Sequence, residues 1–281
     1  YEGKTYLDFS SQLVFTNIGH QHPKVVKAIQ DQAATLTALA PQHSNDARNE
    51  AAQRIVELAG GHFRKVFFTN GGADAIENAI RMVRLHTNKH KVLSTYRSYH
   101  GNTGSAINAT GDPRRFPNEY SFGHVHFWGP YLYRSAFQAT TEEEECQRAL
   151  AHLEQMIIFE GPNTIGAILL ESVGGTAGVL VPPKGYLEGL RALCDKYKIM
   201  WIADEVMSGF GRVGKWFAYQ NSAAIPDLIT FAKGVTSGYV PLGGVVISEA
   251  ISNTFNDRAF PGGLTYSGHP LACAAAVATI D

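Results

Sequence analysis

Short apolar runs alternate with longer stretches of helical period along most of this chain. The apolar runs have the length of strands and show no polar face, which is typical of strands buried on both sides of a sheet. We therefore predict an α/β domain in which a mostly parallel sheet lies between helices. The strands are predicted at 65–69, 91–95, 164–171, 199–204, 228–232 and 244–248. The helices are predicted at 46–59, 73–87, 142–159 and 185–197, with an alanine-rich helix at 270–281.

The first part of the chain follows a different pattern. It predicts a short strand at Tyr6 to Phe9, a turn at Gly19 and a helix that begins at Pro23. We expect this part to form a separate small layer. Tyr1 is not an initiator residue, and the helix at 270–281 has no glycine cap after it, so we expect the protein to continue beyond this sequence.

Composition favours a soluble enzyme with small-molecule partners. The 281 residues are 44% hydrophobic and 17% charged, with a formal net charge of -1. They can bury a large core but attract neither nucleic acid nor an anionic membrane. We find no apolar run long enough to span a bilayer and no signal-peptide pattern. The three cysteines are far apart and form no CxxC pair, which predicts buried free thiols in a reducing, cytoplasmic compartment and no metal site.

Two of the predicted strands end next to side chains that could take part in catalysis or bind a cofactor. Ligands of open α/β sheets collect beyond the carboxyl ends of the strands, so we expect the site there. Lys233 follows the run at 228–232, where lost hydration lowers the pKa of an amine and prepares it to form a Schiff base. Asp204 ends the run at 199–204, where a poorly solvated carboxylate seeks a cation such as a protonated pyridine nitrogen. A helix cap or a structural ion pair is the alternative role for Asp204.

Two further strands lead into segments that suit a flat, phosphorylated ligand. After 65–69, the small residues of Asn70 to Asp74 bring backbone N–H groups at a helix start close to a ligand, which suits a phosphate. After 91–95, Tyr96 to Gly101 places aromatic groups where a flat ring can stack. Taken singly, the first segment also fits an ordinary strand-to-helix turn, and the second fits a packed loop.

A glycine-rich segment raises two rival functions. Residues 209–214 read GxGxxG and residues 209–215 read GxxxxGK, the patterns of dinucleotide binding and of a P-loop. A dinucleotide-binding turn must lead directly from a strand into a helix, yet four residues separate this segment from Asp204 and an aromatic run follows it. The P-loop also needs Ser or Thr where this chain has Trp216. The pair Asp204 and Glu205 then loses its support as a metal-binding pair of the P-loop type.

Seven motifs, in their order along the chain, carry a resemblance to a known family. Together they resemble the class III, or omega, aminotransferases over nearly the whole chain, and their combination is far more specific than any one of them. The motifs are Asn17 to His20, Phe68 to Ala75, Tyr99 to Gly101, Glu171 with Gly174 and Gly175, Asp204 to Arg212, Ala232 to Gly234, and Leu264 to Pro270.

The resemblance implies a pyridoxal 5'-phosphate enzyme with the aspartate-aminotransferase-like fold, also called fold type I. Residues 45–281 would be the cofactor-binding large domain, and residues 1–44 would be the N-terminal segment of a small α+β domain. Three catalytic residues are implied. Lys233 would hold the cofactor and shuttle the proton, Asp204 would keep the pyridine nitrogen protonated, and Glu171 would steer a substrate-binding arginine.

The resemblance also implies a set of cofactor contacts. Gly72 and Ala73 would bind the phosphate through backbone N–H groups. Val206 would pack on one face of the ring and Tyr99 would stack on the other. His100 belongs to the same implied cofactor-binding set.

Thr265 would reach the phosphate of a neighbouring subunit, which implies a homodimer with a shared active site. The sequence departs from the family at several positions. Family members that act on 4-aminobutyrate or ornithine often carry an arginine where this chain has Asn102, and serines are common where it has Gly71 and Ala73. The family's other substrate-binding arginine lies beyond Asp281.

We therefore expect transamination from an ω-amino acid or amine, such as β-alanine, taurine or 4-aminobutyrate, to a 2-oxo acid, with pyruvate ahead of 2-oxoglutarate. From motif order we expect the apolar Leu13, Val14 and Phe15 to line the substrate side. The alternatives are an aminomutase or decarboxylase that uses the same lysine, a nucleotide-binding module built on residues 209–215, and an inactive fragment of an active parent.

Overall fold

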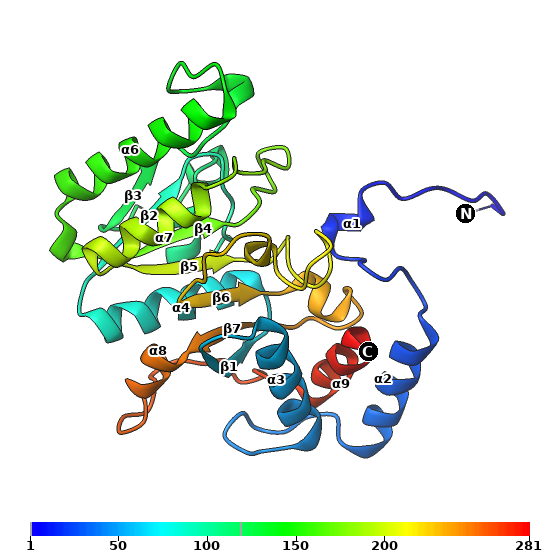
Figure 1. The fold of residues 1–281 in the computed structure, drawn as a ribbon. Coiled ribbons are helices and arrows are strands. Elements are labelled where there is room, and N and C mark those ends of the chain that lie inside the picture. Colours follow the sequence, from blue (N-terminus) through cyan, green and yellow to red (C-terminus); the bar gives the residue numbers. More distant parts are fainter. Residues whose placement is uncertain (1, 119) are drawn as a thin grey trace.

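A seven-stranded sheet organises the computed structural model, which describes residues 2–118 and 120–281 (Figure 1). The strand order is β1-β7-β6-β5-β4-β2-β3, and β7 pairs antiparallel with both of its neighbours while the other pairs are parallel. The predicted mostly parallel sheet is therefore confirmed. The strands are β1 (Phe63–Thr69), β2 (Lys91–Thr95), β3 (His124–Phe127), β4 (Ile165–Glu171), β5 (Met200–Asp204), β6 (Leu228–Phe231) and β7 (Gly243–Ser248).

Helices cover both faces of this sheet (Figure 1). The α-helices are α1 (Ser11–Val14), α2 (Pro23–Thr35), α3 (Asp46–Ala59), α4 (Gly72–Thr87), α5 (Gly104–Ala109), α6 (Glu142–Glu160), α7 (Tyr186–Tyr197), α8 (Glu249–Asn253) and α9 (Pro270–Ile280). Short 3-10 helices are η1 (Pro113–Arg115), η2 (Leu132–Arg134), η3 (Pro162–Thr164), η4 (Ala218–Asn221) and η5 (Lys233–Thr236). Every strand and helix predicted from residue 46 onward is confirmed, with its ends shifted by two residues at most.

Two apolar cores explain why the strands show no polar face. One face of the sheet packs against α3, α6, α7 and α9, through residues such as Ile55, Leu153 and Leu190. The other face packs against α4 and α5, through residues such as Ile80 and Ala106. Because both faces are covered, every residue of β6 and β7 is buried. The parallel strands then bring the carboxyl ends of β2, β4, β5 and β6 to one edge of the sheet.

The strand predicted at Tyr6 to Phe9 is wrong. These residues form extended chain and a turn, and the side chains of Tyr6, Leu7 and Phe9 are mostly exposed. The Asp8 carboxylate accepts hydrogen bonds from the backbone N–H groups of Ser10 (3.0 Å) and Gln12 (2.8 Å), which closes the turn. A short alternating run forms a stable strand only when another strand pairs with it, and none does within the described residues.

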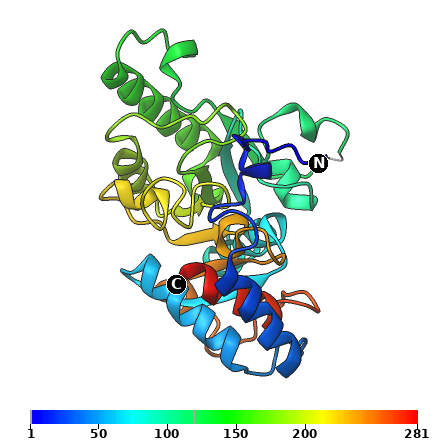
Figure 2. The same cartoon turned by 90° about the vertical axis from the view of Figure 1, so that its right-hand side faces the viewer.

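The rest of the N-terminal part agrees with its sequence pattern. Gly19 has a φ of 78°, as a glycine turn requires, and α2 begins at Pro23. Figure 2 shows α2 and α3, in two shades of blue, beside the red helix α9, and both helices contact α9. The division into residues 1–44 and 45–281 stays a prediction.

The cysteines are free and buried, as predicted. Burial raises the pKa of the Cys194 and Cys273 thiols to about 12. Over the described residues, no helix combines the length and apolar character that crossing a bilayer requires.

Glu205 ties the loop after β5 to the body of the domain. Its fully buried carboxyl group accepts hydrogen bonds from the hydroxyls of Ser172 and Ser208, each at 2.6 Å, and from the backbone N–H groups of Ala218 (2.8 Å) and Tyr219 (2.9 Å). Burial raises the pKa of Glu205, and these four hydrogen bonds oppose that shift. With both oxygens occupied, Glu205 serves as a structural anchor.

Replacing this anchor tests its role. Glu205→Gln keeps the size of the side chain but points amide hydrogens at groups that are themselves donors, so we expect a loss of about 2–4 kcal/mol in the free energy of unfolding. Urea denaturation measures it. As a control, Glu143→Gln on the exposed face of α6 should change stability by less than about 0.5 kcal/mol. Equal stabilities for the two variants would contradict the anchor role.

Candidate active site

A cavity of about 370 Å³ lies beyond the carboxyl ends of β5 and β6 and beside the start of α4. Its volume is within the range of small-molecule sites. Most of the residues predicted to form the site share its wall: Gly72, Ala73, Tyr99, His100, Asp204, Val206 and Lys233. The structure therefore brings together residues that come from four separate segments of the sequence.

Asp204 is the last residue of β5 and forms the most buried charged part of the cavity wall. Its side chain is only 4% exposed. His100 Nδ1 lies 2.7 Å from Asp204 Oδ2, and the Val206 N–H donates to Asp204 Oδ1 at 3.0 Å. Because an ionised carboxylate can only accept, His100 Nδ1 carries the proton in this pair. His100 Nε2 is buried and has no hydrogen-bond partner among residues 2–118 and 120–281.

The start of α4 provides free backbone donors to the same cavity. Its N-cap residue is Gly71, which has no side chain that could accept a hydrogen bond from the helix. The first N–H groups of a helix have no partner within the helix, so those of Gly72 and Ala73 are available to an anion. Glycine is required close by, because a Cβ at Gly72 would lie 2.9 Å from Val206 Cγ1, and one at Gly101 would lie 2.5 Å from Ala73 Cβ.

Lys233 is the first residue of η5, which begins two residues after the last residue of β6, and it lines the cavity with a half-buried side chain. Its φ of 46° is in the left-handed region, which is rare for a residue with a side chain and is often found at functional sites. The described residues offer no hydrogen-bond acceptor to its ammonium group, so the amine is free to react.

Glu171 lies at the end of β4, paired in register with Asp204 on the neighbouring strand. It does not line the cavity. Instead, its carboxylate accepts from the backbone N–H groups of Tyr99 (3.0 Å) and Gly175 (2.7 Å). Burial raises the pKa of Glu171, the nearby His100 lowers it, and the Asp204 charge raises it further. In this structure, Glu171 fixes the segment that carries Tyr99.

The chain matches a known protein family over its full length. The family model described as aminotransferase class-III matches residues 1–281. The chain belongs to the class III aminotransferase family. Its similarity to relatives extends over nearly the whole length of this chain.

Three relatives illustrate this similarity. The chain is 36% identical to diaminobutyrate--2-oxoglutarate transaminase of Halomonas elongata, over 99% of this chain and 63% of the relative. It is 50% identical to the solved taurine:2-oxoglutarate aminotransferase from Bifidobacterium kashiwanohense, described as a complex with PLP and glutamate, with a TM-score of 0.97 over 100% of this chain and 64% of that one. A solved (S)-enantioselective omega-transaminase from Thermomicrobium roseum is 40% identical, with a TM-score of 0.95 over 99% and 65% of the two chains. This class III chain thus spans less than two thirds of these relatives.

Thr265 lies apart from the cavity. It is exposed in a loop that forms a second hollow with residues 38–42. Arg48 holds both sides of that hollow, because its side chain donates to the carbonyl oxygens of Gly268 (2.8 Å) and Pro41 (3.0 Å). The contact of Thr265 with a neighbouring subunit stays a prediction.

The N-terminal segment reaches the cavity through Phe15, as predicted, whereas Leu13 and Val14 are not in its wall. Leu13 is 76% exposed. The glycine-rich segment at 209–215 explains how Phe15 is held. Asn17 Nδ2 donates to the Phe210 carbonyl at 2.8 Å, and the Arg212 side chain donates to Asn17 Oδ1.

The same segment does not have the context of a nucleotide-binding loop. A turn and the short 3-10 helix η4 follow it, where both nucleotide motifs require the start of an α-helix. Residues 209–215 therefore form a structural loop beyond Asp204.

Sequence reasoning missed Arg114. Its Cζ atom lies 3.6 Å from the centre of the Tyr99 ring, and its Nε donates to both carboxylate oxygens of Asp112, at 3.1 and 3.0 Å. Hydrogen bonding to Asp112 raises the pKa of Arg114. The Asp-Pro-Arg-Arg run at 112–115 signals a capped turn, but nothing in it indicates a contact with Tyr99.

The close approach of α4 to Gly101 gives a testable prediction. Gly101 has a φ of 129°, and a Cβ there would collide with Ala73, so Gly101→Ala should lower the free energy of unfolding by about 2–4 kcal/mol. Gly71→Ala is the matched control, because no atom lies within 4 Å of its added Cβ and its φ of -174° suits any residue. Urea denaturation of both variants measures the difference, and a stable Gly101→Ala protein would show that α4 is free to move.

Proposed function

We propose that this chain is the cofactor-binding part of a pyridoxal 5'-phosphate-dependent aminotransferase. It would move the amino group of an ω-amino acid or amine to a 2-oxo acid. One observation carries the proposal: the cavity combines a free lysine, a buried carboxylate and an uncapped helix start. The membership of the class III family and the relative described in complex with PLP support it.

The residues of the cavity fit this cofactor. The free N–H groups of Gly72 and Ala73 suit its phosphate, and Asp204 suits its protonated ring nitrogen. Tyr99 and Val206 would cover the two faces of its ring, and Lys233 would hold it covalently. When bound, pyridoxal phosphate supplies an electrophilic carbonyl group and a ring that accepts an electron pair.

Residues of the chain would then supply a negative charge beside the cofactor ring and a group that carries the proton. The His100 and Val206 N–H groups donate hydrogen bonds to the Asp204 carboxylate, which stabilise its negative charge. That charge favours a positive group in front of it. The Lys233 amine would take the proton from the substrate carbon and return it at a different atom. The left-handed backbone at Lys233 sets the direction of its side chain.

The substrate class rests on the site and on the relatives. The cavity wall carries Asn102 in place of an arginine, and Phe15 and Leu242 add apolar surface. We therefore propose taurine, β-alanine and 4-aminobutyrate as donors to test. We propose 2-oxoglutarate beside pyruvate as an acceptor to test, because the names of two relatives include 2-oxoglutarate.

We also propose a homodimer in which Thr265 reaches the partner's cofactor phosphate. The exposure of Thr265, in a hollow separate from its own cavity, supports this arrangement. The buried free thiols support a cytoplasmic location. The proposed domain division places residues 1–44 in the small domain and 45–281 in the large one.

Amine-dependent loss of cofactor absorbance tests the function directly. Purified protein with pyridoxal phosphate should absorb visible light, and taurine, β-alanine or 4-aminobutyrate alone should bleach it and release one carbonyl product per site. A 2-oxo acid should restore the absorbance. Continued product formation without an oxo acid would instead indicate a decarboxylase or aminomutase, and a protein that gains no absorbance would contradict the proposal.

Lys233→Ala tests the assignment of the lysine. The variant should fold and bind the cofactor non-covalently, but its turnover should fall by about a thousandfold or more because both the anchor and the proton carrier are lost. Lys215→Ala is the matched control, since this exposed lysine ends the GxxxxGK run. Steady-state transamination rates compare the variants. Substantial activity in Lys233→Ala, or its loss in Lys215→Ala, would overturn the assignment.

A further inference from the structure

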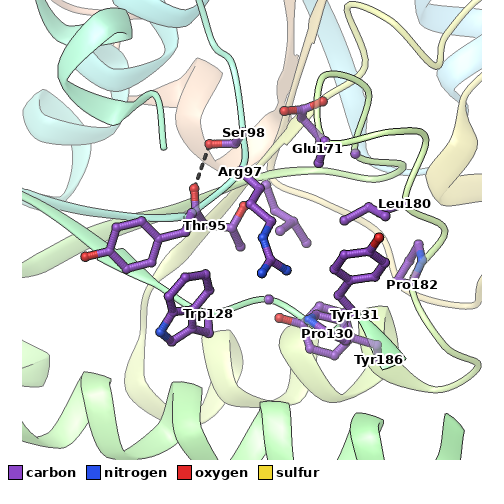
Figure 3. Close-up of a pocket in the computed structure, with 15 residues that line it drawn as sticks. Thr95, Arg97, Ser98, Trp128, Pro130, Tyr131, Glu171, Leu180, Pro182 and Tyr186 are labelled. Atoms are coloured by element: carbon purple, nitrogen blue, oxygen red, sulfur yellow. Dashed lines mark hydrogen bonds between the residues drawn. The ribbon is translucent and has the colours of Figure 1, made fainter. Parts of the chain in front are cut away.

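A second, smaller cavity of about 50 Å³ lies beyond the carboxyl ends of β2 and β4 (Figure 3). The function proposed above makes no use of it. Its wall contains one cation, Arg97, together with the aromatic side chains of Tyr96, Trp128, Tyr131 and Tyr186. A space of this size holds a few water molecules or a small ion, and it is too small for a nucleotide or a sugar.

The guanidinium group of Arg97 contacts aromatic rings but makes no hydrogen bond to any described residue. Its Cζ atom lies 5.1 Å from the centre of the Trp128 ring and 4.9 Å from that of Tyr131. Such contacts use the faces of the guanidinium group and leave its N–H donors free. In the part of the chain that the structure describes, no carboxylate or carbonyl oxygen accepts from them. Figure 3 shows the Arg97 side chain reaching between Trp128 and Tyr131.

The backbone of Arg97 supports this interpretation. Its φ of 63° is left-handed, which costs a residue with a Cβ atom on the order of 1 kcal/mol or more. Strained positions of this kind cluster at ligand sites, because the surrounding structure holds them for the direction they give the side chain. Here that direction is into the small cavity.

Tyr186 is a second, independent polar group without a partner. It is the first residue of α7, its side chain is 1% exposed, and its hydroxyl makes no hydrogen bond to any described residue. Burial raises the pKa of Tyr186, so the hydroxyl stays protonated and can donate. An unpaired buried hydroxyl costs about 1–3 kcal/mol, which a ligand that accepts a hydrogen bond would recover.

The charges around the cavity favour an anion. Arg115 lies near the outer wall, with its Cζ 5.7 Å from the centre of the Tyr96 ring, while the Arg114 charge is matched by Asp112. The one acid in the wall, Glu171, already accepts backbone hydrogen bonds on both oxygens. A planar carboxylate matches the fork of a guanidinium group and can accept from a hydroxyl as well.

We propose that the cavity between Arg97 and Tyr186 binds a small carboxylate, separately from the cofactor cavity. Arg97 would hold it through its free N–H groups, and Tyr186 would donate the second contact. The site is linked to the larger cavity, because Tyr99 and His100 follow Arg97 in the same loop. Glu171, in the wall of the small cavity, also accepts a hydrogen bond from the Tyr99 N–H. A bound carboxylate would stiffen the segment that carries Tyr99 and His100.

Acetate titration of the purified protein tests this proposal. Pyridoxal phosphate is kept saturating so that the larger cavity is occupied, and ionic strength is held constant with chloride. We expect a saturable change in tryptophan fluorescence and a rise in Tm, since a ligand of the folded state stabilises it. Acetamide, with the same shape and no charge, should do neither.

Arg97→Gly is the sharpest variant, because glycine accepts the left-handed backbone and the protein should still fold. Its acetate dissociation constant should rise at least tenfold. Arg115→Gln removes a nearby charge outside the cavity wall and should change the constant less than twofold. A response that is absent in the wild type, or equal in the wild type and Arg97→Gly, would show that the cavity holds only water.

Tyr186→Phe separates the two contacts. Without acetate the variant should be at least as stable as the wild type, because it loses an unpaired buried hydroxyl. Its affinity for acetate should fall several-fold. An unchanged affinity would exclude Tyr186 as a ligand contact and overturn the proposed pair. The test does not depend on transamination, so its failure would leave the proposed function standing.

Discussion

The buried carboxylate of Asp204 is the constraint around which the rest of the site is arranged. A charge at the inner end of a central strand is tolerated only if donors stabilise it, and the fold supplies the His100 ring and the Val206 N–H group. These two donors do not neutralise the charge by themselves, so the cavity in front of Asp204 favours a cationic ring nitrogen. The order of the parallel strands then places Lys233 one strand away, on the same edge of the sheet.

Close backbone packing shapes the remainder of the cavity. Glycine at 72 and 101 lets α4 approach Val206 and the loop that carries His100, which directs free helix N–H groups toward the cavity. On the opposite side, a Cβ at Gly234 would collide with Asn17. The N-terminal segment is thus held against the lysine-bearing turn, and Arg212 secures it from the glycine-rich loop. Residues 209–215, whose sequence matches nucleotide-binding patterns, hold the N-terminal segment of the same chain through hydrogen bonds with Asn17.

The sequence predicts the structure well wherever a local pattern, such as an unbroken apolar run, determines the element. Strands buried on both faces appear as unbroken apolar runs, and the residues at their carboxyl ends must meet at one edge, so Asp204 and Lys233 could be placed in advance. The strand at 124–127 was missed because it is short and carries two histidines, and the strand at 6–9 was wrong because no other strand pairs with it. The contacts of Arg97 and Arg114 with aromatic rings depend on tertiary structure alone. The proposed contact of Thr265 would be made with a second subunit, so no local pattern around Thr265 predicts it.

The most direct test of this account is the rate at which Asp204→Asn, saturated with pyridoxal phosphate, transfers the amino group of a donor. Asparagine keeps the shape of the side chain and removes its charge. We predict a folded protein whose donor half-reaction, followed by stopped-flow absorbance, is slower by about a hundredfold or more. A rate within about threefold of the wild type would show that the Asp204 charge is structural and would contradict the account.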